Sequence, residues 1–117
     1  MDRHDDVARA ERARKIREAN DRLRKTGLGG KTLLSRTVAA MTPEAFTALL
    51  KRVREFDAFT RGNDPWQEHD FGEVLLEGER YFWKIDAYDV NLEYGSPAPE
   101  DDAVTCRVLT LMTAMEL

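Results

Sequence analysis

The fold is decided by one stretch, Glu73 to Asp86, which reads EVLLEGERYFWKID. Two apolar runs flank the pair Glu77-Gly78, and such a pair favours a two-residue β-turn. A hairpin built on this turn pairs Leu76 with Glu79, Val74 with Tyr81 and Glu73 with Phe82. Because side chains alternate along a strand, one face of the hairpin carries the residues that we assign to the core: Val74, Leu76, Tyr81, Trp83 and Ile85.

The other face of this hairpin is only half apolar. It carries Leu75 and Phe82 among three charged side chains, which are Arg80, Lys84 and Asp86. Contiguous apolar surface is rarely left open to water in a small protein. We therefore expect either a helix of this chain or a partner to cover this second face.

The N-terminal third of the chain predicts a helix over residues 7–26. Acid-first pairs four residues apart, such as Glu11 and Lys15, support this helix, and Gly27 ends it. Its apolar stripe is narrow and occurs only in its C-terminal half. Residues 1–12 are therefore expected to form a solvated arm.

Two further helices are predicted on either side of the hairpin. Residues 43–60 begin well, with Thr42 as the N-cap and Pro43 at the first helical position, and they carry a core-facing apolar stripe. Residues 101–116 open with acidic side chains and place apolar residues at helical spacing: Val104, Val108, Leu111, Met112 and Met115.

Residues 31–37 are rich in Thr and Leu and predict a short strand, and alternation over residues 89–94 is compatible with another. Together with the hairpin at 73–86, these strands predict a small antiparallel sheet. Helices packed on it would give a two-layer α+β fold. The length of 117 residues fits one domain spanning 1–117.

Composition excludes several classes of protein. No window approaches the roughly 20 apolar residues of a membrane span, and the N-terminus lacks the apolar core of a signal peptide. We therefore expect a cytoplasmic protein without a membrane partner, present as a monomer or weak dimer. The single cysteine, Cys106, excludes an internal disulfide and a Cys-rich zinc site.

Charge is distributed unevenly along the chain. Residues 1–27 hold nine Arg and Lys against six Asp and Glu, whereas residues 62–102 hold twelve acids and only two bases. An acidic face of this kind disfavours nucleic-acid phosphates and favours a basic protein partner. The alternative is a solvated face that only maintains solubility.

The most chemically dense stretch, residues 63–72, reads NDPWQEHDFG. Its Asp64, Glu68, His69 and Asp70, with Asp86 and Asp89 from further along the chain, contain the oxygen and nitrogen ligands of a metal site. The spacing matches no known metal-binding motif, and adjacent residues of an extended strand cannot all face one ion. We therefore predict neither a metal nor another cofactor.

Acid–base catalysis is a second reading of the same stretch. His69 beside Asp70 and near Asp64 has the residue types of a tuned imidazole, with Tyr88 or Ser96 able to complete a site. The structural alternative is that the Asp64 carboxylate accepts N–H groups of its own loop, since Asp before Pro commonly starts a turn. This second, structural interpretation is favoured.

Several strings of the sequence are similar to a known family. They include Asn63-Asp64-Pro65, Glu68-His69-Asp70-Phe71-Gly72, Phe82-Trp83-Lys84-Ile85-Asp86 and Tyr94-Gly95-Ser96-Pro97. The chain resembles the domain-of-unknown-function 3768 family over about residues 16–117. This resemblance implies no activity, cofactor or catalytic residue. It does imply a small bacterial cytosolic product of the kind often carried on plasmids, phages and integrative elements.

These observations predict a non-enzymatic binding or inhibitor protein of a mobile genetic element, such as an anti-CRISPR or anti-restriction factor. Its acidic face would occupy a basic surface of a host protein or nucleoprotein complex, without direct contact to nucleic acid. The predicted partner-binding residues are Asp64, Trp66, Glu68, His69, Asp70, Asp86, Tyr88, Asp89, Glu93 and Tyr94. The alternative is a small metal-dependent or acid–base hydrolase with His69, Asp64, Asp70 and Asp86 in its site.

Overall fold

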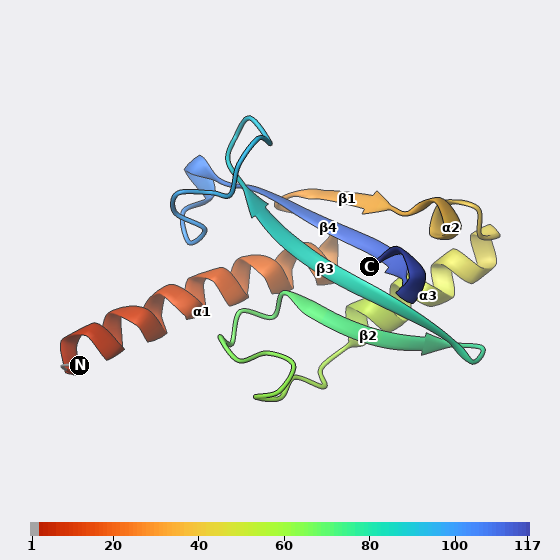
Figure 1. Ribbon diagram of the computed structural model, residues 1–117, viewed down its shortest axis with the longest axis horizontal. Helices are drawn as coiled ribbons and strands as arrows, with labels where there is room; N and C mark the ends of the chain where they lie inside the picture. The colour runs from red at the N-terminus through yellow and green to blue at the C-terminus, as the bar shows by residue number, and fades with distance from the viewer. Residues whose placement is uncertain (1–2) are drawn as a thin grey trace.

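The computed structural model describes residues 3–117 and has two layers, a sheet and the helices packed on it (Figure 1). The predicted α+β class is confirmed. In chain order the elements are α1 (Arg3–Thr26), β1 (Lys31–Leu34), α2 (Arg36–Ala39), α3 (Pro43–Glu55), β2 (Phe71–Leu76), β3 (Glu79–Tyr88) and β4 (Cys106–Thr113). Short 3-10 turns, η1 (Asp102–Val104) and η2 (Ala114–Glu116), flank β4.

The strands lie in the order β1-β4-β3-β2. β3 is antiparallel to both of its neighbours, β2 and β4, whereas β1 runs parallel to β4. The sheet is therefore mixed, and the predicted antiparallel sheet is wrong in this respect. The error follows from β4, because residues 101–116 were expected to be helical.

The central hairpin has the predicted register, with Leu76 opposite Glu79 and Val74 opposite Tyr81. Its turn residues, Glu77 and Gly78, have φ values of 51° and 82°. Positive φ at both central positions is the geometry whose twist matches that of the flanking strands. The local chemistry of two residues thus fixes which side chains of β2 and β3 share a face.

The predicted helix over residues 101–116 is wrong, because residues 106–113 form β4. This strand lies between β1 and β3, so both of its edges are paired within the sheet. Val108, Leu109, Leu111 and Met112 are all buried. A strand buried on both faces has a nearly continuous apolar run, and such a run also fits the spacing of a helix.

The predicted strand over residues 89–94 is also wrong. The Asp89 carboxylate accepts the N–H groups of Asn91 and Glu93, both at 3.1 Å, and Leu92 has a φ of 59°. This closes a tight loop immediately after β3. Side-chain acceptance of nearby N–H groups competes with strand pairing at Asp and Asn residues.

Several element boundaries differ from the expected ones. The hairpin is longer than residues 73–86, because β2 begins at Phe71 and β3 ends at Tyr88. α1 begins at Arg3, before residue 7, and Met1 and Asp2 of the predicted arm lie outside the described residues. β1 ends at Leu34, short of residue 37, because the Ser35 hydroxyl caps α2. α3 ends at residue 55 rather than 60, since the chain becomes extended at its C-cap residue, Phe56.

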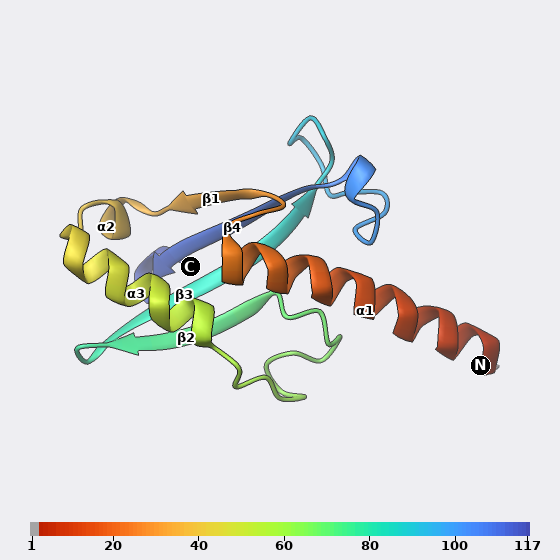
Figure 2. The ribbon, with the colours of Figure 1, turned by 180° about the vertical axis from the view of Figure 1, so that it is seen from behind.

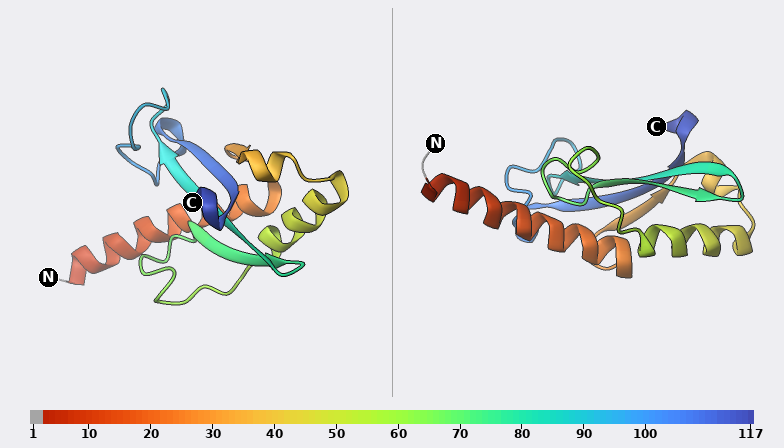
Figure 3. Two further views of the ribbon diagram at one scale, coloured as in Figure 1. Left: turned by 45° about the vertical axis from the view of Figure 1, so that its right-hand side comes forward. Right: turned by 90° about the horizontal axis from the view of Figure 1, so that it is seen from below.

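Both long helices, α1 and α3, lie on the same face of the sheet (Figure 2; Figure 3). We call this the covered face. Trp83 at its centre has no exposed surface, and buried residues from the sheet and the helices surround it: Leu23, Val38, Leu49, Val53, Val74, Leu76, Ile85, Leu109 and Leu111. At about 25 cal/mol per Å² of apolar area, this cluster is the main source of stability.

The opposite face of the sheet, which we call the open face, has no long helix on it among residues 3–117 (Figure 3). It carries the alternate side chains of the strands, including Leu33, Leu75, Phe82, Lys84 and Val108. The expectation that a helix of this chain covers it is therefore wrong for the described residues. Within residues 3–117, no helix is both long enough and apolar enough to cross a membrane.

Candidate functional site

The loop between α3 and β2 carries most of the residues singled out from the sequence, and Asp64 organises it. Asp64 is buried, and its Oδ1 accepts the backbone N–H groups of Glu68 and His69, each at 3.1 Å. A buried carboxylate needs such donors, because desolvation would otherwise favour its neutral form. Asp64 thus holds the two ends of the 64–69 segment together.

His69 joins this loop to α1. Its Nδ1 lies 2.9 Å from Oδ1 of Asp21, and its Nε2 lies 3.6 Å from Oδ2 of Asp64. Its ring stacks on Phe59 with a centroid separation of 3.6 Å and an interplanar angle of 3°. The stacking on Phe59 therefore fixes the orientation of the imidazole ring, and both ring nitrogens face carboxylates.

Arg24 extends the same network to the end of α3. Its Nη2 donates to Asp21 at 3.1 Å, and its Nη1 donates to the carbonyl oxygens of Val53, Arg54 and Phe56 at 2.9, 3.2 and 3.0 Å. These carbonyls belong to the last turn and C-cap of α3, where partial negative charge accumulates. The guanidinium also lies 5.0 Å from the centre of the Trp83 ring.

We refer to Asp21, Arg24, Asp64 and His69 as the clamp. Two further contacts from α1 support it: Asn20 donates to the Glu68 carbonyl at 2.9 Å and Arg17 donates to the Gln67 carbonyl at 2.9 Å. Gln67 and His69 have φ values of 56° and 53°, which side chains other than glycine adopt at some energetic cost. The contacts with α1 hold the loop in this conformation.

A hollow of about 320 Å³ lies beside the clamp and is lined by Phe59, Thr60, Asp64 and His69, among others. A histidine oriented by a carboxylate is one part of an acid–base site. Here, however, the second nitrogen of His69 faces Asp64 rather than a hydroxyl or thiol. The Thr60 hydroxyl accepts the N–H of Asn63 at 3.2 Å, so it closes the loop instead of meeting the imidazole.

No group of three or more His, Cys, Asp and Glu side chains within residues 3–117 is arranged to hold a metal ion. The carboxylates around Glu68 and Asp70 do, however, affect one another electrostatically. Partial burial raises the pKa of Glu68, and the nearby carboxylates of Asp70 and Asp64 raise it further. Burial likewise raises the pKa of Asp70, with Asp64 and Asp86 adding to the effect. We call Asp64, Glu68, Asp70 and Asp86 the acidic cluster.

The other residues predicted to bind a partner are spread over separate elements. Asp86 and Tyr88 lie on the open face, where Asp86 pairs with Lys84 at 3.1 Å. Glu93 and Tyr94 are exposed on the loop after β3. Trp66, 76% exposed, borders a different hollow along the N-terminal half of α1. The structure therefore does not join all ten residues into one patch.

Folding also neutralises part of the acidic segment. Arg12 of α1 lies 3.3 Å from Glu100, and the buried Arg107 lies 2.9 Å from Asp102. The charge balance of residues 62–102 therefore overstates the charge that a partner would meet. The acidic cluster is the part in which nearby carboxylates raise the pKa of Glu68 and Asp70.

Sequence reasoning missed Asp21, Asn20, Arg24 and Phe59 as residues that fix the loop. One signal was present. Asn20 and Arg24 fall on the same side of α1 as its buried apolar residues, one turn or two beyond Ile16. Polar side chains on a buried stripe of a helix are expected to have specific partners, because leaving them without hydrogen bonds is costly.

Comparison with known proteins finds a family match. A family described as "Protein of unknown function (DUF3768)" matches residues 34–116, which include the whole α3–β2 loop and the strands from β2 onward. No curated protein and no solved structure matches the chain. The matched range contains Asp64 and His69 of the clamp, whereas Asp21 and Arg24 lie before it.

Proposed function

The chain belongs to the DUF3768 family of proteins of unknown function, and from this premise we propose that it is a non-enzymatic binding protein that docks on a basic partner through the acidic cluster. The observation that carries the proposal is the gathering of four carboxylates, where partial burial raises the pKa of both Glu68 and Asp70 and the nearby carboxylates raise it further. Carboxylates in this state gain more from a Lys or Arg side chain than isolated, fully solvated ones do.

The partner we propose is a host defence complex whose basic channel normally holds nucleic-acid phosphates. A protein of a mobile genetic element that occupies this channel would act as an anti-CRISPR or anti-restriction inhibitor without touching nucleic acid itself. Asp89 and Glu93, on the loop that follows β3, would extend the acidic contact beyond Asp86, with the exposed Tyr94 of that loop as an aromatic anchor. The exposed Trp66 would be a second anchor, on the α3–β2 loop with Glu68.

The test measures binding of the purified protein to the defence nuclease complexes of its natural host at low and high salt. We expect binding that weakens steeply with salt, and a loss of roughly tenfold or more for the double variant Asp86→Lys, Glu93→Lys. Glu79→Lys is the matched control. Glu79 is an exposed acid on β3, the strand that also carries Asp86, but it lies at the opposite end of that strand. Equal loss in the control, or nucleases that stay fully active when the protein is present, would refute the proposal.

The hydrolase alternative is favoured by one observation, the Asp21–His69 pair beside the 320 Å³ hollow. Assays of ester and phosphodiester hydrolysis, with and without divalent ions, separate the two functions. Binding without catalysis predicts no turnover above that of Asp21→Asn or His69→Ala. Turnover that His69→Ala abolishes and Glu79→Lys retains would instead identify an enzyme.

A further inference from the structure

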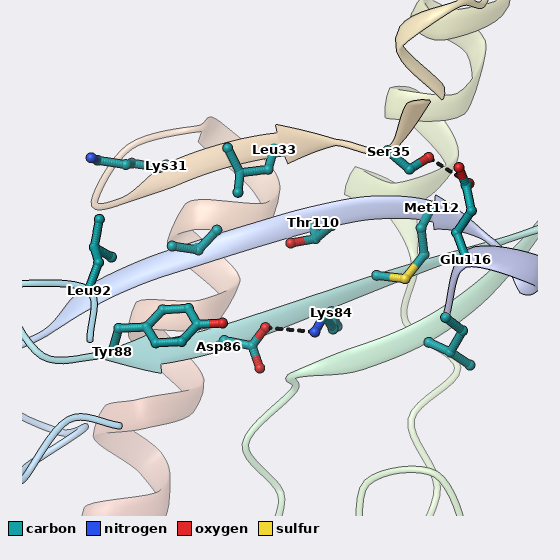
Figure 4. A pocket seen from close by; sticks show the side chains of 12 residues that line it. Lys31, Leu33, Ser35, Lys84, Asp86, Tyr88, Leu92, Thr110, Met112 and Glu116 are labelled. Atoms are coloured by element: carbon teal, nitrogen blue, oxygen red, sulfur yellow. Dashed lines mark hydrogen bonds and ion pairs between the residues drawn. The ribbon is translucent and has the colours of Figure 1, made fainter. Parts of the chain in front are cut away.

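The open face contains a groove of about 550 Å³ that the proposed function does not use as a site (Figure 4). Val108 and Met112 of β4 lie along it, and Leu33 of β1 and Leu92 of the loop after β3 border it. A volume of this size, with a largely apolar lining and a few polar groups, is typical of sites for small molecules. The groove is therefore a candidate ligand site.

Most charged groups around the groove already have partners. Lys84 and Asp86 form an ion pair at 3.1 Å (Figure 4). Glu116 keeps its negative charge, and its carboxylate accepts hydrogen bonds from Ser35 (Figure 4) and from Thr113. By contrast, no ion pair joins Lys31 to another residue in the described range 3–117. An occupant that complements this groove is thus apolar over most of its length and carries one negative charge near Lys31.

Both ends of the groove are bounded. Tyr88 and Leu92 lie at one end, and Glu116 lies at the other, beyond Met112 (Figure 4). The Tyr88 and Thr110 hydroxyls lie between these ends as possible hydrogen-bonding groups. A helix or strand of a partner protein runs on past its contact site and would meet these ends. A ligand of limited length fits between them.

We propose that this groove binds a small apolar monoanion, such as a medium-chain or aromatic carboxylate. Its hydrocarbon part lies on Leu33, Val108 and Met112, and its carboxylate pairs with the Lys31 ammonium. The site is separate from the acidic cluster apart from Asp86, whose carboxylate is already paired with Lys84. Variants at Lys31 and Leu33 lie outside the acidic cluster, so they test binding in the groove without changing that cluster.

The experiment titrates the full-length, isotope-labelled protein with sodium decanoate and, in parallel, with neutral 1-decanol, and follows the backbone amides by NMR. We expect saturable shifts below about 1 mM decanoate, confined to residues around the groove. Decanol should cause shifts at the same amides with roughly two- to fivefold weaker affinity, because it lacks the ion pair. Lys31→Gln should remove this difference without weakening decanol binding.

Two leucines of the open face give a matched control. Leu33 and Leu75 are both 54% exposed and both lie on edge strands, but only Leu33 lines the groove. Leu33→Asp should weaken decanoate binding roughly tenfold or more, and Leu75→Asp should leave it unchanged.

Three results would overturn the proposal. One is equal loss in the two leucine variants, and another is decanol binding as tightly as decanoate. The third is a set of amide shifts around the groove that depends on protein concentration without ligand, which would show that a second copy of the chain occupies it. The dispersion of amide chemical shifts in the spectrum of each unliganded variant confirms that the variant is folded.

Discussion

The two faces of the sheet are built from alternate residues of the same strands, yet they differ in how their side chains are buried. On the covered face, Trp83 is enclosed by α1, α3 and the loop that follows α3. On the open face, Phe82 is also buried, but its neighbours are side chains of the sheet itself, such as Phe71. Low exposure therefore has two different causes in adjacent residues of one strand.

The covered face therefore acts as the structural scaffold, and the open face acts as a surface. A covered-face side chain is fixed by contacts with several elements, so removing it leaves a cavity. On the open face, water can enter the space that a truncated side chain leaves. Binding sites are consequently easier to change there without unfolding the protein, and the predictions below test that difference.

The largest effect should come from truncating Trp83. Trp83→Ala is expected to lower the free energy of unfolding by about 4 kcal/mol, because it leaves a cavity between the sheet and the helices. Phe82→Ala should cost only about 2 kcal/mol, since the vacated space is on the open face. Urea denaturation of the two variants measures both values. Equal losses would show that the open face is as tightly enclosed as the covered one.

Removing Arg24 should have the next largest effect. Arg24→Met keeps the apolar stem but leaves the Asp21 carboxylate and the α3 carbonyls without their buried donor, at an expected cost of about 3 kcal/mol. Arg22→Met is the matched control, because Arg22 is exposed on the same helix and its loss should cost under about 0.5 kcal/mol. A small effect at Arg24 would mean that packing alone holds α1 against α3.

The covered face could largely be predicted from the sequence. The Glu77-Gly78 turn sets the register of β2 and β3, and the register places Val74, Trp83 and Ile85 together. The turn and the register both depend on residues that are close together in the sequence. The helical interpretation of residues 101–116 failed for the opposite reason, because β4 is central and has buried apolar residues on both faces of the sheet. Periodicity alone cannot distinguish such a strand from a helix.

The clamp could be predicted only in part. That Asp64 would accept N–H groups of its own loop follows from local turn chemistry, and the structure contains these bonds. The pairing of His69 with Asp21 joins residues 48 positions apart in the chain. Nothing in the spacing of a single sequence specifies such a pair, because it depends on where the sheet places the loop against α1.

A smaller effect is expected at His69. His69→Phe preserves the stacking on Phe59 but removes both polar contacts, so it should cost about 1.5 kcal/mol. In this variant, hydrogen exchange of the amides at positions 68 and 69 should accelerate more than that of the β3 amides, because the loop loses its link to α1. Uniform acceleration across the protein would instead indicate that His69 supports the whole core.

The smallest effect should come from Asp70 in the acidic cluster, which contains carboxylates of the α3–β2 loop and of the open face. Burial and the nearby Asp64 and Asp86 raise the pKa of Asp70 in the folded protein above its ordinary value of 3.8. The folded state therefore holds this proton more tightly than the unfolded state does. The resulting stabilisation is complete below the ordinary pKa and is lost as the pH rises through the raised value.

It follows that ionised Asp70 destabilises the folded protein at neutral pH and that its amide counterpart does not. Asp70→Asn should raise the free energy of unfolding near pH 7 by about 0.5 kcal/mol, and this gain should shrink as the pH falls toward the ordinary pKa. Thermal unfolding at several pH values measures it, with Asp57→Asn at an exposed loop position as the control. A gain that is independent of pH would mean that the amide group, rather than removal of the charge, stabilises the cluster.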